Sequence, residues 1–418
     1  SILGVLLIGI FSATRVIPAS QVVQFLVTVT WLMAGSLILT GLLQLMFTRF
    51  IADRLFERRH DIVLPNLMGA LTLTTLVSGL SGMLILLLLF HQSLLYELLV
   101  LGSFVVLCNI WIVVVFLSGM KAYRLILGVF LLGYGVTVAV AMLMTGFGLE
   151  GLLFGFLCGQ SVLLFSMLAM VLRDYPGRAF VSYRFLRRDQ VFYSLAATGL
   201  FYNMAIWADK FMFWLNPATS ESIIAPLRAS VIYDVPIFLA YLSIIPGMAV
   251  FLVRMETDFA EIYDRFYESV REGDTLKHIR EYKKQMVLTV RQGIYEIFKV
   301  QGMTVVVLLM LGPLILDALG ISRLYIPLLN VDLVGVGVQV LLLAILNVLF
   351  YLDLLGIALL LCLMFLLANI GLTWISFQLG PSFYGYGFAV AVTVTSLVGL
   401  VILSRQLDRL EYETFMLQ

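Results

Sequence analysis

The chain has 418 residues, of which 62% are hydrophobic and only 12% are charged, and its formal net charge is +1. Soluble domains are roughly half apolar and about a quarter charged, so this composition excludes an ordinary soluble protein. The three cysteines and three histidines are scattered along the chain, which excludes a disulfide framework and argues against a metal site. We therefore expect an all-α polytopic membrane protein without a metal or other cofactor.

Apolar windows of about 20 residues, the length that crosses a bilayer as a helix, predict about twelve membrane spans. In chain order these spans are 1–12, 21–48, 66–90, 97–119, 122–145, 151–172, 190–215, 230–253, 297–318, 331–350, 354–375 and 385–403. Because Ser1 already lies inside an apolar run, we expect the chain to begin within its first span.

The distribution of positive charge tests this order independently, because Lys and Arg concentrate in cytoplasmic loops. Placing 49–65 in the cytoplasm also places there 120–124, 173–189, 254–296 and the tail from Ser404. Only four of the 26 Lys and Arg residues then lie on the other side: Arg15, Lys210, Arg228 and Arg323. This asymmetry predicts that both ends of the chain are cytoplasmic.

The polar segment 173–189 follows the sixth predicted span and divides the chain into two halves. We predict an N-terminal six-helix bundle (1–172), a cytoplasmic linker (173–189), a C-terminal six-helix bundle (190–403) and a cytoplasmic tail (404–418). Two six-span halves are typical of transporters built from pseudo-symmetric repeats.

The longest polar segment, 254–296, is predicted to form a cytoplasmic helical hairpin with a turn at Gly273-Asp274. Its first helix carries an apolar stripe at helical spacing: Phe259, Ile262, Tyr263, Phe266 and Tyr267. One interpretation is a pair of helices lying along the membrane surface. The other is a docking site for a cytosolic partner, because rows of aromatic residues suit interfaces.

The clearest concentration of polar residues in the spans lies in the seventh and eighth spans and the loop between them. Its members are Asn203, Trp207, Asp209, Lys210, Arg228, Tyr233 and Asp234. A charge inside a bilayer costs roughly 2.5–3.5 kcal/mol on insertion scales, so each one needs a physical reason. We predict that these residues meet at an outward-facing mouth, where they bind a polar substrate, relay protons or gate a cavity. The alternative is a structural ion pair, either Lys210 with Asp234 or Asp209 with Arg228.

Other features of the spans bear on flexibility and packing. Pro236, Pro246 and Gly247 are predicted to break the eighth span, and Gly312-Pro313 the ninth, as in transporters that rock. Isolated polar residues in the spans predict interhelical hydrogen bonds or a wet cavity: Gln44, Asn109, Gln160, Gln339, Asn347 and Asn369.

Several functions are excluded by what the sequence lacks. It has no P-loop, so ATP consumption by this chain is not expected. No loop is long enough for a nucleotide-sugar transferase domain. We therefore expect no enzymatic activity, no catalytic residue and no nucleic-acid partner.

Three segments carry a resemblance to a known family: IWADKFMFWL (206–215), YDVPIFLAYLSIIPGMAVFLVRMETDFAEIYDRFY (233–267) and the KHIR to VRQGIYEIFKVQG stretch. They resemble the PelG family of exopolysaccharide transporters over essentially the whole chain. The short charged segment and Gly-Pro lead with which the family begins are not part of this sequence. The resemblance implies the multidrug/oligosaccharidyl-lipid/polysaccharide flippase fold, with two six-helix bundles around a cavity.

The resemblance also implies a bacterial inner-membrane protein that moves a cationic, amino-sugar-rich biofilm polysaccharide to the periplasm. The companions it implies are the cytosolic glycosyltransferase PelF, the membrane scaffold PelE and the cyclic di-GMP receptor PelD. Docking of PelF on the 254–296 hairpin is our own hypothesis.

The leading hypothesis is therefore a polysaccharide translocator coupled to a docked synthase, with Asp209 and Asp234 attracting the glycan. The alternatives within transport are a flippase for lipid-linked oligosaccharide and a cation-coupled exporter of the same fold. From a different class, the chain could be mainly a membrane scaffold for the synthase complex. The least favoured alternative is an integral glycosyltransferase.

Overall fold

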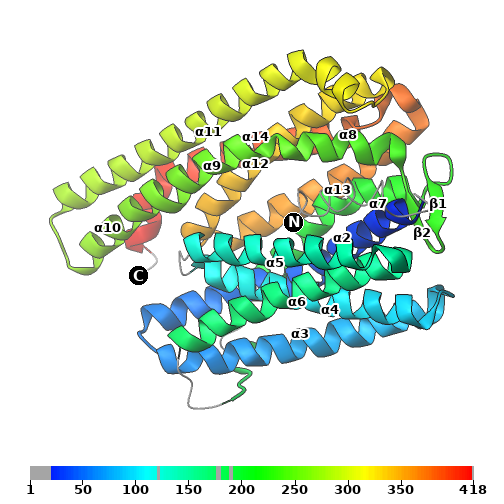
Figure 1. Ribbon diagram of the computed structural model, residues 1–418. Coiled ribbons are helices and arrows are strands. Elements are labelled where there is room, and N and C mark those ends of the chain that lie inside the picture. Colours follow the sequence, from blue (N-terminus) through cyan, green and yellow to red (C-terminus); the bar gives the residue numbers. More distant parts are fainter. Residues whose placement is uncertain (1–19, 120–122, 176–179, 188–191, 417–418) are drawn as a thin grey trace. The chain divides into compact units, whose positions relative to one another are not determined.

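The computed structural model describes residues 20–119, 123–175, 180–187 and 192–416, and these are almost entirely helical (Figure 1). The first elements in chain order are α2 (Ser20–Phe56), α3 (His60–Leu89), α4 (Leu94–Gly119), α5 (Tyr123–Leu143), η1 (Thr145–Phe147), α6 (Gly148–Asp174), η2 (Arg184–Leu186), α7 (Tyr193–Leu215), β1 (Glu221–Ile224) and β2 (Leu227–Ala229). They are followed by α8 (Val231–Leu242), α9 (Ile244–Val253), η3 (Arg254–Phe259), α10 (Ala260–Arg271), α11 (Leu276–Ala318), η4 (Arg323–Tyr325), α12 (Ile326–Tyr351), α13 (Leu355–Leu379), η5 (Pro381–Phe383) and α14 (Tyr386–Met416). The predicted all-α class is confirmed.

These elements form two compact units. The first contains α2 to α6, the part of α7 up to Met204, and the antiparallel β1–β2 hairpin; the second contains the rest of the described chain. The chain therefore enters the second unit within α7, returns to the first for Glu221–Ala229, and enters the second again at Ser230. The predicted division into two six-helix halves around 173–189 stays a prediction.

Ten helical segments of the described chain are long and apolar enough to cross a membrane, and they correspond to ten of the twelve predicted spans. The first predicted span, 1–12, lies outside the described residues. The seventh corresponds to α7, which has the length of a span but is too polar to belong to the ten. The chain is a multi-pass membrane protein.

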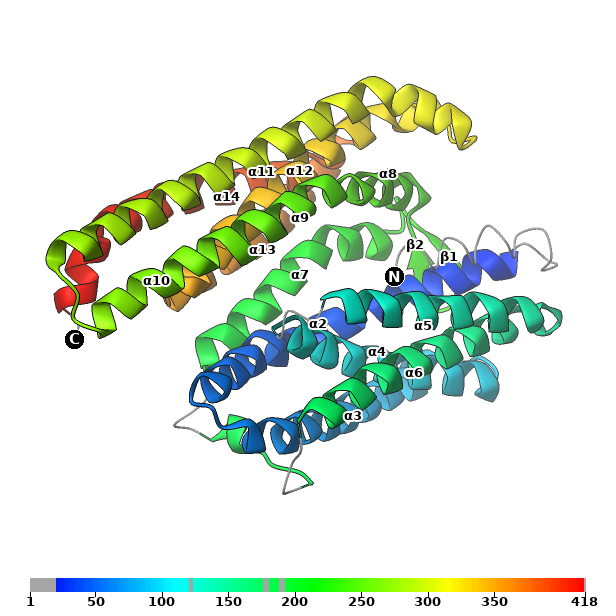
Figure 2. The same ribbon diagram turned by 60° about the vertical axis from the view of Figure 1, so that its left-hand side comes forward.

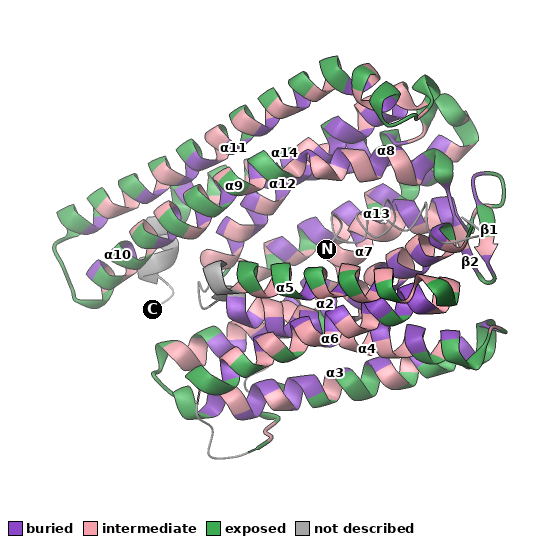
Figure 3. Cartoon of the chain, in the orientation of Figure 1, coloured by how far each residue is buried: buried purple, intermediate pink, exposed green. Residues whose placement is uncertain are grey.

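The surface of α3 shows that the solvent of the first unit is lipid. Four of its leucines expose more than half of their side chains on one helical face, at spacings of four, four and three residues: Leu76, Leu80, Leu84 and Leu87 (Figure 3). A continuous exposed apolar stripe of this kind is unstable in water and stable against acyl chains.

Helices α5 and α6 of the first unit pack through small residues. On α6, glycine recurs at every fourth position, at Gly151, Gly155 and Gly159. A Cβ at Gly155 would lie 2.5 Å from the backbone nitrogen of Ala141 on α5, so only glycine allows this approach. Without a hydrophobic drive between helices in lipid, such close backbone packing is what holds a helix pair together.

The described part of the predicted linker is packed against the first unit. The backbone nitrogen of Ser182 donates to the carbonyl of Pro65 at 2.8 Å, and that of Arg184 donates to Asn66 Oδ1 at 2.9 Å. Phe185 is fully buried, with its ring centroid 5.4 Å from that of Phe47. This segment is therefore anchored to the N-terminal turns of α3 and the end of α2.

The predicted break in the eighth span is confirmed near Pro246, whereas Pro236 lies inside α8 without breaking it and the predicted break in the ninth span is wrong. Helix α8 ends at Leu242 and α9 begins at Ile244, because Pro246 has no N–H with which to continue the hydrogen-bond ladder. Gln301 of α11 donates to the carbonyl of Ser243, the residue between the two helices, at 3.1 Å. Pro313, in contrast, lies inside a single α11 helix that runs to Ala318.

The predicted hairpin is present, but its helices continue the membrane helices of the second unit (Figure 2). Helix α10 follows α9 through the π-helical turn η3, and α11 continues for 43 residues from the turn onward. At 1.5 Å per residue α11 is about 65 Å long, about twice the thickness of the hydrocarbon core. This continuity favours a hairpin that projects from the bilayer over one that lies along its surface.

The close packing of α5 on α6 predicts that a larger side chain at Gly155 destabilises the protein. Gly155→Leu should lower the thermal unfolding midpoint of the purified protein and its monodisperse yield, because overpacking typically costs about 1–3 kcal/mol. The matched control is Gly135→Leu on α5, where a Cβ would meet no heavy atom within 4 Å. Equal behaviour of the two variants would contradict the close packing.

Candidate functional site

The candidate site is a buried network of charged and polar side chains in the second unit, centred on the carboxylate of Asp209. Asp209 and Lys210 are neighbours on α7, and both side chains are buried. Lys210 Nζ lies 3.0 Å from Asp209 Oδ2 and donates a further hydrogen bond to the carbonyl of Ile206 at 2.9 Å. A backbone carbonyl and a carboxylate thus accept hydrogen bonds from a buried ammonium.

Two other helices supply donors to the same carboxylate. Tyr233 of α8 donates from Oη to Asp209 Oδ2 at 2.5 Å, and Asn369 of α13 donates from Nδ2 to Asp209 Oδ1 at 3.1 Å. Asn369 is itself oriented, because it also donates to the carbonyl of Ala205 at 2.8 Å and accepts from Thr373 Oγ1 at 3.1 Å. Asp209 therefore connects α7, α8 and α13.

Aromatic rings complete the surroundings of Lys210. Its Nζ lies 5.1 Å from the ring centroids of both Tyr241 on α8 and Phe388 on α14. A cation over aromatic faces gains about 2 kcal/mol when it is desolvated. These contacts add two more directions from which the ammonium is stabilised.

Asp332 of α12 adds a second buried carboxyl group to the network. It is fully buried and interacts electrostatically with both Lys210 and Asp209, yet neither of its side-chain oxygens has a hydrogen-bond partner among the described residues. One ammonium thus faces at least two carboxylates. Because an uncompensated buried charge is expensive, this arrangement suits the binding of a proton or cation.

The predicted ion pair of Lys210 with Asp234 is wrong, and that of Asp209 with Arg228 stays a prediction. Lys210 pairs with its neighbour Asp209, whereas Asp234 accepts from Trp214 Nε1 at 2.8 Å and from the backbone nitrogen of Ser230 at 2.9 Å. Asp234 therefore fixes the start of α8 against the end of α7.

The remaining predicted site residues lie in different places. Trp207 is in the second unit, with its ring centroid 6.1 Å from that of Trp214. Asn203 and Arg228 belong to the first unit. Asn203 donates to the carbonyl of Gly199 at 2.9 Å, and the carbonyl of Arg228 accepts from Trp31 Nε1 at 2.9 Å.

Among the seven predicted residues, the structure brings together Asp209, Lys210 and Tyr233, with Asp234 close by.

The five predicted docking residues face the interior of the hairpin to different extents. Phe259 and Phe266 are buried, while Ile262, Tyr263 and Tyr267 are half-buried. Tyr351 of α12 packs on Phe259 and Tyr263, with ring centroids 5.2 and 5.3 Å apart. Docking through this stripe stays a prediction, and truncating Phe259 or Phe266 would damage the hairpin itself.

Sequence reasoning found some members of the network and missed others. The interhelical hydrogen bonds predicted for isolated polar residues in the spans are confirmed for Asn109, Asn347 and Asn369. Tyr241 and Asp332 were missed. A lone carboxylate near the start of the apolar window 331–350 was the available signal for Asp332.

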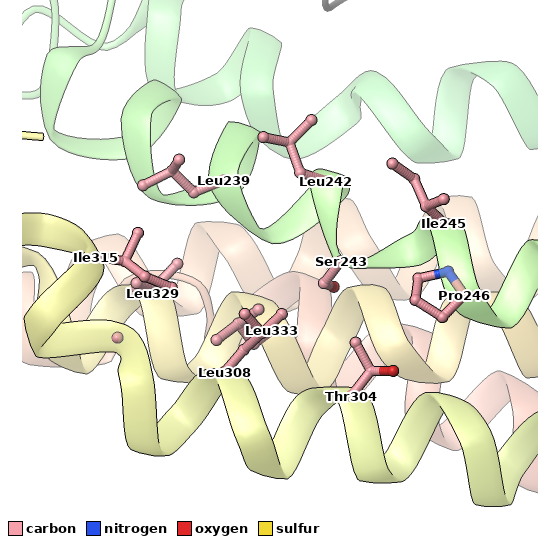
Figure 4. Close-up of a pocket in the computed structure, with 11 residues that line it drawn as sticks. Leu239, Leu242, Ser243, Ile245, Pro246, Thr304, Leu308, Ile315, Leu329 and Leu333 are labelled. Atoms are coloured by element: carbon pink, nitrogen blue, oxygen red, sulfur yellow. The ribbon is translucent and has the colours of Figure 1, made fainter. Parts of the chain in front are cut away.

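A separate cavity in the second unit, of about 430 Å³, is apolar (Figure 4). Leucine and isoleucine side chains from α8, α9, α11 and α12 line it, together with Pro246, Ser243 and Thr304. With so few hydrogen-bonding groups, this cavity fits a hydrocarbon chain better than a sugar.

Comparison with known proteins gives a family and a fold. The family described as "PelG: Putative exopolysaccharide Exporter (EPS-E)" matches residues 1–415. The chain is similar to an outward-facing multidrug resistance MATE family transporter of the MOP superfamily, with a TM-score of 0.72 and 14% identity over 98% of this chain and 94% of that one. It is also similar to a MOP superfamily transporter from Pyrococcus furiosus, with a TM-score of 0.69 and 13% identity over 97% and 92%. No curated protein matches the chain. The flippase-superfamily fold is thereby confirmed.

The network predicts that removing its ammonium destabilises the protein. Lys210→Met leaves the buried carboxylates unpaired and should cost roughly 3–5 kcal/mol, measured as a lower thermal midpoint of the purified protein. The control is Arg323→Met, which removes the exposed pair with Asp317 and should cost about 0–1 kcal/mol. Similar shifts in both variants would contradict a buried ion pair at Asp209.

Proposed function

Because the chain belongs to the PelG family of exopolysaccharide exporters, we propose that it moves a nascent, Pel-type amino-sugar polysaccharide across the bacterial inner membrane from cytoplasm to periplasm. The observation that carries this proposal is the match of the family over residues 1–415 in a chain with a transporter fold. In this proposal both ends of the chain are cytoplasmic, and the chain transports without catalysing a reaction.

The buried network of the second unit supports a role in transport. Ionisable residues in membrane helices are rare and mark substrate or ion pathways by default. A purely structural pair would be balanced, whereas Asp332 adds a carboxylate without a hydrogen-bond partner among the described residues. This unpartnered buried carboxyl group favours a second candidate function, in which export is coupled to the movement of a proton or cation through the network.

Asp332→Asn tests transport separately from folding. The substitution replaces an unpartnered buried carboxyl group with an amide of nearly the same shape that does not ionise, so the thermal midpoint should stay the same or rise, while secretion of polysaccharide should fall at least tenfold. Secreted and retained polymer are measured in cells whose own copy of the chain is deleted. Asp264→Asn on the exposed face of α10 is the control and should secrete normally.

Two outcomes of this experiment speak against the proposal. Normal secretion by Asp332→Asn would indicate that the network has only a structural role and would favour the alternative in which the chain is a membrane scaffold. Cells lacking the chain that still secrete the polymer would contradict the export function itself.

We place the docking of the cytosolic glycosyltransferase PelF on the exposed face of α11. Toward the tip of the hairpin this face is basic in net charge, because Lys277, Arg280 and Lys284 recur there at spacings of three and four residues and Glu281 is the acidic residue among them. Closer to the apolar part of α11 the same helix exposes Tyr295 and Phe298, by 65% and 60%, as aromatic residues at a membrane interface do.

The distance along α11 favours a protein partner over lipid headgroups. Lys277 precedes Tyr295 by 18 residues, which is about 27 Å of helix. Charges more than about 8 Å apart are largely screened at physiological ionic strength. The basic residues at the tip are thus beyond the reach of the membrane surface and complement an acidic surface on a cytosolic partner, with PelE and PelD as the proposed membrane companions.

Charge reversal tests this docking face. Arg280→Glu with Lys284→Glu should abolish co-purification of the glycosyltransferase and reduce secretion, while the exporter keeps its thermal midpoint. The matched control, Arg265→Glu with Arg271→Glu, makes the same change of charge on exposed positions of α10. Equal loss in both pairs, or no loss in the first, would contradict a docking face on α11.

A further inference from the structure

A second cavity, of about 540 Å³, lies in the first unit where α2, α4 and α6 begin. Its lining is mostly polar, in contrast to the apolar cavity of the second unit. The side chains that matter for its chemistry are Gln21, Gln24, Gln92, Ser93, Glu150 and Phe147. A volume of this size is typical of small-molecule sites, which range from about 300 to 1,000 Å³.

The β1–β2 hairpin contributes Ile224 to the lining of this cavity and is held by side chains of other elements of the first unit. Gln24 Nε2 donates to the Ile223 carbonyl at 3.5 Å, and Gln92 Nε2 donates to the Ala225 carbonyl at 3.3 Å. Each glutamine thus uses its amide N–H on the hairpin and keeps its Oε1 for another donor.

One polar atom in the wall has no hydrogen-bond partner within the described part of the chain. Gln21 Oε1 is buried and accepts no hydrogen bond from the described residues. It lies against the backbone of Gly148, whose φ of +62° and missing side chain leave room for the amide. Buried polar atoms normally find a partner, so this oxygen is an acceptor available to a bound hydroxyl or amide.

The groups around the cavity select a class of ligand. Glu150 holds the hydroxyl of Ser93 and can accept a further hydrogen bond, and Phe147 exposes 72% of its side chain beside it. Amide and carboxylate acceptors next to an exposed aromatic face match the hydroxyls and the apolar ring face of a sugar. Among the described residues, the cavity lining contains no Lys or Arg, which argues against phosphate, and its one carboxylate is too few for a divalent cation.

We propose that this cavity is a saccharide-binding subsite, in which Phe147 stacks on a sugar ring while Glu150 and the glutamine amides bind its hydroxyl or acetamido groups. The subsite rests on the proposed function, in which the same chain exports a polysaccharide. It is predicted to hold the polymer at the outward end of the first unit.

The direct test is binding to the purified full-length protein in lipid nanodiscs. The probe is a soluble N-acetylhexosamine hexamer, titrated and detected by saturation-transfer NMR, with maltohexaose as a second neutral probe. Wild type should bind at least one of the two saturably, and Phe147→Ala and Glu150→Gln should each weaken that binding about tenfold. Phe165→Ala, a matched truncation of an exposed aromatic on α6, should bind as wild type does.

Three results overturn the subsite: no saturable binding by wild type, unchanged binding in both variants, or an equal loss in Phe165→Ala. The thermal midpoint of each variant identifies a folding defect. Phe147→Ala is the variant in which a folding defect is least expected, because the Phe147 side chain is largely exposed. Secretion of the polymer by cells distinguishes the two proposals. If the wild-type protein does not export the polymer, the proposed function is wrong. If the wild-type protein exports normally and both variants keep unchanged saccharide binding, only the subsite is wrong.

Discussion

The carboxylate of Asp209 holds three helices of the second unit in register, because it accepts hydrogen bonds from Lys210 on α7, Tyr233 on α8 and Asn369 on α13. An ionised group is costly inside a bilayer and is tolerated only where protein groups replace its water. Rotation of α8 or α13 would remove a hydrogen-bond donor from the buried carboxylate of Asp209. The network therefore fixes both the order and the rotation of the helices around it.

The same network contains an imbalance that packing alone does not require. Asp332 lies near Asp209 and Lys210, yet its own oxygens accept no hydrogen bond from the described residues. A neutral residue of similar shape would be more stable there, since an unpartnered buried polar group costs about 1–3 kcal/mol, and more when charged. Positions that break a local rule without an evident structural gain are where function is expected. A carboxylate that can exchange a proton or cation offers such a gain.

Several features could be predicted from the sequence because they depend on local composition. Ten spans follow from apolar windows, and the Asp209-Lys210 pair is conspicuous because charges are rare in spans. Tyr233 belongs to the same predicted cluster, 24 residues from Asp209, whereas Asn369 could not be assigned as a partner because it is 160 residues away along the chain. The apolar stripe of α10 has the same spacing whether it binds a partner or packs inside its own hairpin. Strands β1 and β2, of four and three residues, are too short to leave a periodic signal.

The polar groups of the two units differ in a way that matters for moving a polymer. A conduit must bind its cargo well enough to admit it and weakly enough to release it. The cavity of the first unit meets that requirement with neutral amides, one carboxylate and an exposed ring, whose hydrogen bonds exchange readily with water. The network of the second unit is unsuited to direct contact with a large glycan, because Asp209 and Asp332 are fully buried and Lys210 nearly so. Its buried charges are suited instead to respond to a small cation or a proton, and the change in their balance would alter the bonds that hold α7, α8 and α13 together.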